Sequence, residues 1–153
     1  VRQWHRPVRL AGRLGCGQHA GHDLLGAHDA ADPVAQRQEI FKQYKQTVGT
    51  MAKTVKGETP YSKDEFAKLA AHLDALAQQP WQHFPAGSDK GKTDARAEIW
   101  SKPQDWKAAI DKHKTETAKL KQTAAGGDLA AIKAQFGATQ KTCKACHDSF
   151  RND

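Results

Sequence analysis

Four stretches of this chain carry apolar residues at helical spacing, and proline or glycine separates each stretch from the next. In the first, Val34, Phe41, Val48 and Val55 recur every seven residues after Asp32-Pro33, a pair typical of a helix start. The other three begin near Ser62, Ser101 and Asp128. This pattern predicts an all-α fold, an antiparallel up-down-up-down four-helix bundle.

The segment between the second and third stretches, residues 80–101, contains Pro80, Pro85, Gly87 and Gly91 and therefore predicts a long loop. Aromatic and aliphatic side chains at both of its ends indicate that these ends pack on the bundle. They are Trp81, Phe84, Ile99 and Trp100.

The composition is that of a single domain with a modest core, because 38% of the 153 residues are hydrophobic. No apolar run approaches the roughly 18 residues that a membrane span needs, so we expect no span. The net charge of +7 is spread over lysines interleaved with Asp and Glu. Because no basic stripe with aromatic residues is evident, we expect no nucleic-acid binding.

Residues 1–31 differ in composition from the rest, with four of the eight histidines and without Lys or Glu. Polar residues interrupt every apolar run, so the segment is a poor signal peptide. Three interpretations of residues 1–31 are open: a fragment of a longer precursor, a disordered extension or a mistranslated signal region. We favour the last. We expect the mature chain, a four-helix bundle of residues 32–153, to begin near Ala31 or Asp32. The histidines around Cys16 have no metal-site spacing.

Near the C-terminus lies Cys143-Lys-Ala-Cys146-His147, a C-x-x-C-H motif. Two thiols three residues apart can add to the two vinyl groups of one haem, and the adjacent imidazole can ligate its iron. A zinc site would need a second ligand pair, and a thioredoxin-like pair would need a βαβ setting. We therefore predict one covalently bound haem c, with His147 as the iron ligand.

The antiparallel topology predicts which residues face the other side of the iron. The end of the fourth helix should lie beside residues 35–45, where Phe41 points inward but cannot ligate iron. Met51 lies ten residues further on, about 15 Å along a helix, and is expected to fill the core. His72, His83 and His113 are weaker candidates. We therefore expect a five-coordinate iron with a crowded, apolar vacant side.

Several short motifs in residues 32–153 together resemble the cytochrome c′ family, the class II c-type cytochromes. They are Arg37-Gln38, Val55-Lys-Gly57 with Pro60-Tyr61, Pro80-Trp81-x-x-Phe84, Arg96-Ala-Glu-Ile-Trp100, Gly127-Asp-Leu129 and Cys143-Lys-Ala-Cys-His-Asp-Ser-Phe-Arg151. The resemblance implies that Phe41 blocks the distal side, that Arg37 and Gln38 lie near the haem propionates, and that Trp81 packs in the pocket. It further implies that Arg151 lies near His147, and that Asp94 in the long loop reaches the haem edge.

The resemblance also implies a periplasmic, non-enzymatic and often dimeric haem protein. Its high-spin iron would bind nitric oxide and carbon monoxide and take part in electron transfer or nitric oxide handling. Methionine-ligated relatives place Met four residues after the helix-one Arg, where this chain has Phe41. The alternative is a simple six-coordinate electron carrier with a distal Met or His. In an electron carrier, Lys42, Lys141 and Lys144 would steer an acidic redox partner, whose identity is unknown.

Overall fold

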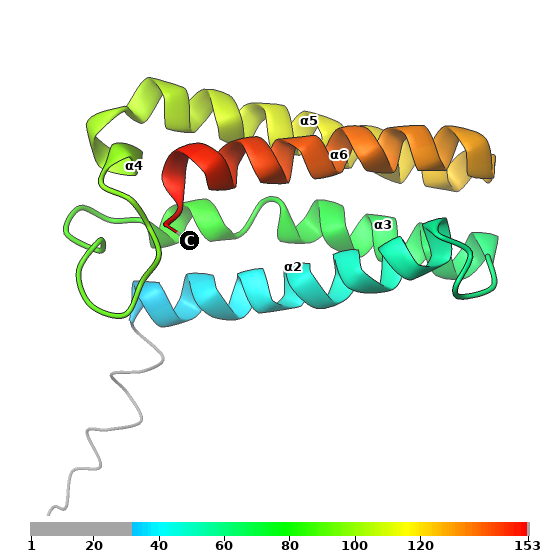
Figure 1. Cartoon of the computed structure of the whole chain (residues 1–153), viewed down its shortest axis with the longest axis horizontal. Coiled ribbons are helices and arrows are strands. Elements are labelled where there is room, and N and C mark those ends of the chain that lie inside the picture. Colours follow the sequence, from blue (N-terminus) through cyan, green and yellow to red (C-terminus); the bar gives the residue numbers. More distant parts are fainter. Residues whose placement is uncertain (1–31, 153) are drawn as a thin grey trace, which may run out of the picture.

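The computed structural model describes residues 32–152, and these form an antiparallel bundle of four long helices. They are α2 (Pro33–Val55), α3 (Lys63–Leu76), α5 (Pro103–Gly126) and α6 (Leu129–Phe150). The helices alternate in direction along the chain, and the long loop and the C-terminus lie at the same end of the bundle (Figure 1). No strand occurs among residues 32–152, so the predicted fold class is confirmed.

Local sequence signals explain where the helices begin. The side chains of Asp32, Ser62 and Asp128 accept hydrogen bonds from the backbone N–H groups of the first turns of α2, α3 and α6, as the sequence predicts. Pro33 occupies the first turn of α2, where its missing N–H costs nothing. Gly127 ends α5 with a φ of 78°, a left-handed conformation that glycine adopts without strain.

The buried face of α2 is rotated slightly from the predicted stripe. Ile40, Tyr44 and Met51 are buried, whereas Phe41 and Val48 are only half-buried. A helix of 3.6 residues per turn drifts relative to a seven-residue repeat, so neighbouring positions share the contact with α3. Phe41 and Val48 instead line a cavity on the side facing α6.

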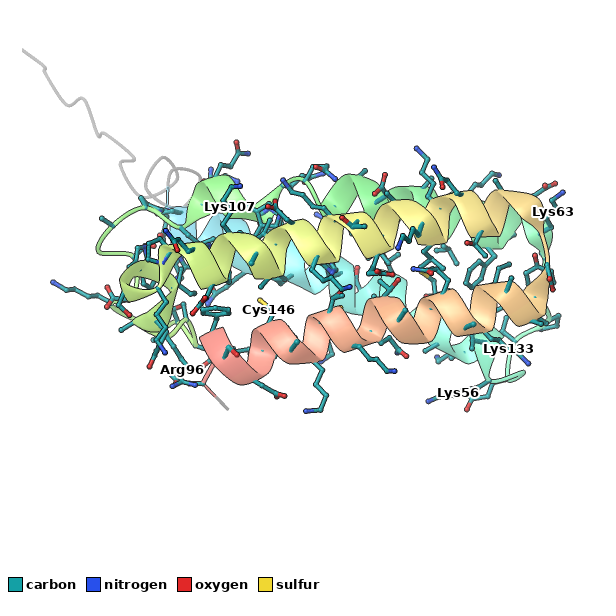
Figure 2. All side chains as sticks on the ribbon, turned by 90° about the horizontal axis from the view of Figure 1, so that it is seen from above. Lys56, Lys63, Arg96, Lys107, Lys133 and Cys146 are labelled. Carbon is teal, nitrogen blue, oxygen red and sulfur yellow. The ribbon has the colours of Figure 1, made fainter. Side chains whose placement is uncertain are left out.

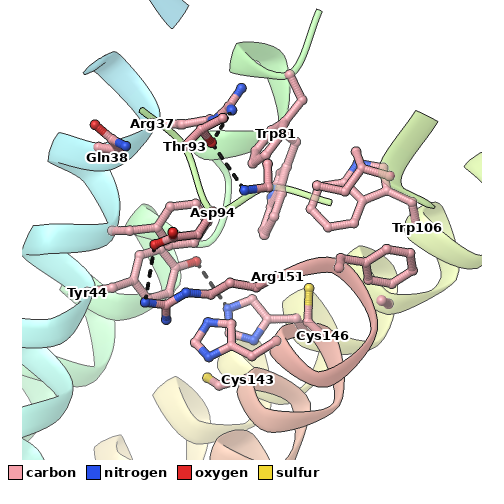
Figure 3. A pocket seen from close by; sticks show the side chains of 18 of the residues that line it. Arg37, Gln38, Tyr44, Trp81, Thr93, Asp94, Trp106, Cys143, Cys146 and Arg151 are labelled. Atoms are coloured by element: carbon pink, nitrogen blue, oxygen red, sulfur yellow. Dashed lines mark hydrogen bonds and ion pairs between the residues drawn. The ribbon is translucent and has the colours of Figure 1, made fainter. Parts of the chain in front are cut away.

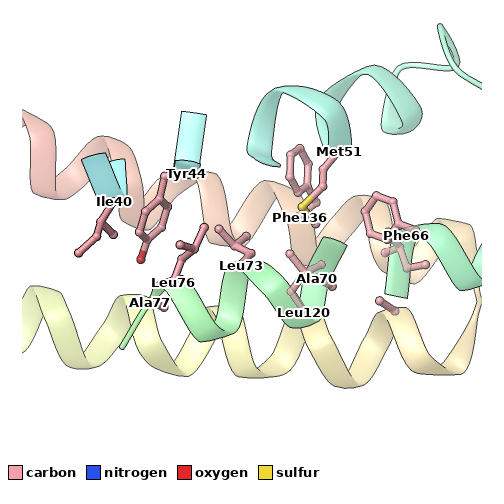
Figure 4. Close-up of a cluster of buried hydrophobic side chains, with 12 residues drawn as sticks. Ile40, Tyr44, Met51, Phe66, Ala70, Leu73, Leu76, Ala77, Leu120 and Phe136 are labelled. Atoms are coloured by element: carbon pink, nitrogen blue, oxygen red, sulfur yellow. The ribbon is translucent and has the colours of Figure 1, made fainter. Parts of the chain in front are cut away.

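The hydrophobic core runs along the inside of the bundle between the long helices (Figure 4). Met51, Phe66, Leu73, Leu120 and Phe136 are each 3% exposed or less. Met51 is therefore a core residue, as predicted from its position along the first helix. The backbones of α2 and α3, of α3 and α5, and of α5 and α6 pack closely, but no comparable packing joins α2 to α6.

The long loop contains two short helical turns, η1 (Pro80–His83) and α4 (Glu98–Ser101). Its ends pack on the bundle as predicted: Ile99 is 4% exposed, and the Trp100 indole N–H donates to the backbone oxygen of Phe84. The third long helix begins at Pro103 rather than at Ser101. The backbone of Lys102, with φ −124° and ψ 64°, lies outside the helical region and therefore separates α4 from α5.

Within residues 32–152, none of the helices is both long enough and apolar enough to cross a lipid bilayer. Charged side chains such as Lys107 and Lys133 point away from the bundle, while Cys146 points inward (Figure 2). The expectations for residues 1–31, including their histidines and Cys16, concern a segment outside the described residues.

Candidate functional site

A cavity of about 510 Å³ lies at the loop end of the bundle, between α2 and α6. Its volume is in the range of pockets that bind small molecules and cofactors, roughly 300–1,000 Å³. All nine site residues predicted from the sequence line this one cavity (Figure 3). They are Arg37, Gln38, Phe41, Trp81, Asp94, Cys143, Cys146, His147 and Arg151.

The two thiols and the imidazole of the C-x-x-C-H motif lie on α6 at positions i, i+3 and i+4. Residues at this spacing share one helix face, so all three line the same wall of the cavity. Burial raises the pKa of Cys143, and burial followed by the nearby Cys143 raises the pKa of Cys146 to about 11. Both thiols are therefore protonated at neutral pH before any cofactor binds.

His147 has the chemistry of an iron ligand. Partial burial, followed by the positive charge of Arg151, lowers the pKa of its imidazole, against the opposing effect of Asp148. A neutral imidazole offers a ring nitrogen lone pair to a metal. The donor set on α6 therefore fits a haem held by two thioether bonds and one axial histidine.

Aromatic rings from α2, η1, α5 and the end of α6 form another part of the wall. The Phe41 ring on α2 meets Trp81 edge to face, with centroids 6.2 Å apart. Trp81 in turn meets Trp106, and Trp106 meets Phe150, at centroid distances of 5.6 and 5.1 Å. The Trp81 indole N–H donates to the backbone oxygen of Ala77 at 2.6 Å, which fixes the ring. Flat apolar rings of this kind suit a planar macrocycle.

Arg37 is buried, with 2% exposure, and its guanidinium joins α2 to the long loop. Its two terminal nitrogens donate four hydrogen bonds of 2.7–3.0 Å, to the backbone oxygens of His83 and Ser88 and to the hydroxyls of Ser88 and Thr93. The guanidinium carbon also lies 4.5 Å from the centre of the Phe84 ring. Every one of these partners is neutral, so a positive charge remains beside the cavity.

Backbone hydrogen bonds also join the long loop to the end of α6 and to the residues that follow it. The backbone N–H of Arg96 donates to the Phe150 oxygen at 2.9 Å, and that of Asn152 donates to the Asp94 oxygen at 2.7 Å. The Asp94 and Arg151 side chains approach to 3.9 Å but are 66% and 54% exposed. Exposed ion pairs contribute little stability, so the backbone bonds hold the loop against the end of α6. Gln38 adds a bond from α2 to the Lys92 backbone oxygen at 2.9 Å.

Three further side chains form a hydrogen-bonded relay that sequence reasoning did not foresee. The Tyr44 hydroxyl lies 3.1 Å from His113 Nε2, and His113 Nδ1 lies 2.8 Å from the Thr142 hydroxyl. The three residues come from α2, α5 and α6 and all line the cavity. The cavity is thus not wholly apolar.

Burial, followed by the proximity of His147, lowers the pKa of His113 from 6.5 to about 4. The unfolded chain therefore takes up a proton at this histidine at a higher pH than the folded protein does. We expect the free energy of unfolding to fall as the pH drops from above 6.5 to about 4, by about 3 kcal/mol in total. Urea unfolding across this pH range measures the effect. A His113→Gln variant should lose most of this slope, and an unchanged slope would contradict the assignment.

Comparison with known proteins agrees with this geometry. The family model described as Cytochrome C′ matches residues 32–151. The cytochrome c′ of Alcaligenes xylosoxydans xylosoxydans is 35% identical over 120 residues, which are 78% of this chain and 93% of that protein. The structure of cytochrome c prime from Shewanella frigidimarina superposes with a TM-score of 0.78 at 35% identity, covering 80% of this chain and 96% of the other.

A nitric oxide complex of a variant of cytochrome c prime from Alcaligenes xylosoxidans superposes with a TM-score of 0.76 at 34% identity, over 80% of this chain and 94% of that one. The matched region contains the whole cavity and all four long helices. The last helix of the bundle carries the C-x-x-C-H motif, and the family match covers all four long helices. The chain is therefore a haem protein of the cytochrome c′ family.

Proposed function

We propose that this protein holds one haem covalently through Cys143 and Cys146, with His147 as its single protein ligand, and binds nitric oxide or carbon monoxide on the opposite face. The haem supplies the iron at which a diatomic gas binds. The observation that carries the proposal is that the motif on α6 and Phe41 on α2 line the same cavity. The positive charge of Arg37, with Gln38 next to it, would favour haem propionates at this end of the cavity.

The proposal of a vacant iron face is supported by the positions of the residues that could otherwise occupy it. Met51 is fully buried in the hydrophobic core and does not line the cavity. Both ring nitrogens of His113 lie in hydrogen bonds. His72 is exposed, and His83 is not among the lining residues. These positions disfavour the six-coordinate alternative.

Phe41 is proposed as the gate of the vacant side. Its ring packs between Tyr44, at a centroid distance of 5.5 Å, and Trp81, and it must move to admit a ligand. We expect Phe41→Ala to bind carbon monoxide faster by about tenfold, equivalent to about 1.4 kcal/mol of the barrier, and more tightly. Flash photolysis of the ferrous protein measures both rates, and Val48→Ala, on the same face of α2, serves as the matched control.

Two results would count against this assignment. Unchanged carbon monoxide kinetics in Phe41→Ala would remove Phe41 as the gate. A sharp low-spin ferrous spectrum that ignores carbon monoxide in the unaltered protein would show a sixth ligand. That second result would favour the electron carrier, in which exposed lysines such as Lys42 and Lys141 steer an acidic partner and reduction depends strongly on salt.

The remaining parts of the proposal follow from the family. Haem attachment to C-x-x-C-H normally takes place outside the cytoplasm, and we propose a periplasmic location. We also propose a homodimer that takes part in electron transfer or nitric oxide handling without enzymatic activity. The relative that is seen in complex with nitric oxide supports the choice of gas.

A further inference from the structure

Two polar side chains, Tyr44 and His113, are buried in the wall of the cavity in which we propose that a gas binds, called the gas pocket below. A hydrogen-bond donor beside the bound gas would alter which gas binds more tightly. Tyr44 is 7% exposed and His113 is 6% exposed, and both line the cavity. Tyr44 follows Phe41 by one turn of α2, and the two rings are in contact, with their planes 31° apart. The phenol therefore lies beside the residue that we propose as the gate.

The direction of each hydrogen bond in the relay follows from counting hydrogens. The Thr142 hydroxyl has one hydrogen, and it donates that hydrogen to the backbone oxygen of Thr139 at 2.6 Å. The hydrogen between Thr142 and His113 must then belong to His113 Nδ1. A neutral histidine protonated at Nδ1 carries a lone pair at Nε2, so Nε2 accepts the hydrogen of the Tyr44 hydroxyl. The dashed line from Tyr44 in Figure 3 marks this last bond.

The relay thus occupies the only O–H hydrogen that Tyr44 has. In the opposite tautomer, His113 would donate from Nε2 to Tyr44, and the Tyr44 hydrogen would be free to point into the pocket. The short Thr142–Thr139 bond favours the first arrangement, because reversing the relay would remove that bond. Thr142 directly precedes Cys143, so the relay is tied to the helix that carries the haem motif.

We propose that His113 is a positioning residue for ligand specificity: by accepting the Tyr44 hydrogen, it prevents the Tyr44 hydroxyl from donating a hydrogen bond to a gas bound in the cavity. Bound dioxygen gains more negative charge than bound carbon monoxide, so a donor stabilises dioxygen more. With the Tyr44 hydrogen held by His113, bound dioxygen gains no hydrogen bond from this hydroxyl, which favours carbon monoxide and nitric oxide. This inference rests on the proposed gas-binding function.

The test compares variants of the holoprotein in the ferrous, carbon monoxide-bound form. We expect His113→Leu to release the Tyr44 hydroxyl and to shift the infrared C–O stretch of the carbon monoxide complex to lower frequency. In a separate binding measurement, the dioxygen affinity relative to that for carbon monoxide should rise by about tenfold, the size of one net hydrogen bond. The double variant Tyr44→Phe with His113→Leu should show neither change. His113→Gln, whose amide can accept from Tyr44 and donate to Thr142, should resemble the unaltered protein.

The outcomes separate this inference from the proposed function. If the unaltered protein fails to bind carbon monoxide, the proposed function is wrong. If it binds carbon monoxide but His113→Leu leaves the C–O stretch unchanged, or the double variant shows the same shift, the role of His113 is wrong. Nitrogen NMR of the ring gives an independent measurement that does not depend on variants folding. It should find His113 protonated at Nδ1, and protonation at Nε2 would overturn the proposal.

Discussion

Replacing both Cys143 and Cys146 with serine is expected to abolish covalent haem attachment completely. A serine hydroxyl is similar in size to a thiol but does not add to a haem vinyl group, so neither thioether forms. His147 and the aromatic wall remain in this variant, so any haem that binds should be removable. Haem staining of the denatured protein on a gel, and extraction of haem into acidified acetone, measure the loss.

Two control variants make this prediction specific to the motif. Each single serine variant should keep one thioether and remain stained. Cys16→Ser should leave attachment unchanged, because Cys16-Gly-Gln-His19 lacks the second cysteine of an attachment motif. Loss of staining in Cys16→Ser, or retained staining in the double variant, would contradict the assignment of Cys143 and Cys146.

Replacing Arg37 with methionine is expected to lower the free energy of unfolding by about 4 kcal/mol. Methionine fills much of the same volume but donates none of the four hydrogen bonds. The oxygens of His83, Ser88 and Thr93 would then lose their shared donor, and Ser88 is itself buried. Urea unfolding measures the total loss, and hydrogen exchange should show faster exchange in the loop around residues 84–95.

Arg37→Lys separates the charge of Arg37 from its hydrogen-bonding geometry. Lysine keeps the positive charge, but a single ammonium group cannot reach the four acceptors that the planar guanidinium spans. We therefore expect Arg37→Lys to lose most of the same stability. If Arg37→Lys has the same free energy of unfolding as the unaltered protein, charge alone is sufficient. The loop then does not depend on the hydrogen-bonding geometry of the Arg37 guanidinium.

The helices were predictable because their signals are local. Asp32, Ser62 and Asp128 cap helices within two or three residues of themselves, so a short window of sequence is enough to place these starts. The start of α5 was less predictable, because Lys102 provides no side-chain cap and a separate helical turn ends at Ser101. Short helices such as α4 depend on packing, here that of Ile99, rather than on local propensity.

The residues of the site also differ in how far the sequence alone could predict their positions. Cys143, Cys146 and His147 belong to one motif on one helix, so their spacing alone brings them to one face. Phe41 required one further step, the antiparallel topology, and it lines the same cavity as the motif. Arg37 was assigned to the pocket by resemblance, but its role in holding residues 83–93 appears only when the loop is in place.

The sequence by itself determined the all-helical class, the haem-attachment motif, the absence of methionine at the position of Phe41 and the place of Met51 in the core. The class, the motif and the place of Met51 depend on spacing along a single helix or on the order of helices, and the meaning of Phe41 depends on the family resemblance. Only the tertiary structure decided that Tyr44, His113 and Thr142 form one relay and that Arg37 clamps the loop. These contacts join residues 29 to 69 positions apart. They depend on the rotation of each helix about its own axis, and a displacement of about one ångström would break a hydrogen bond.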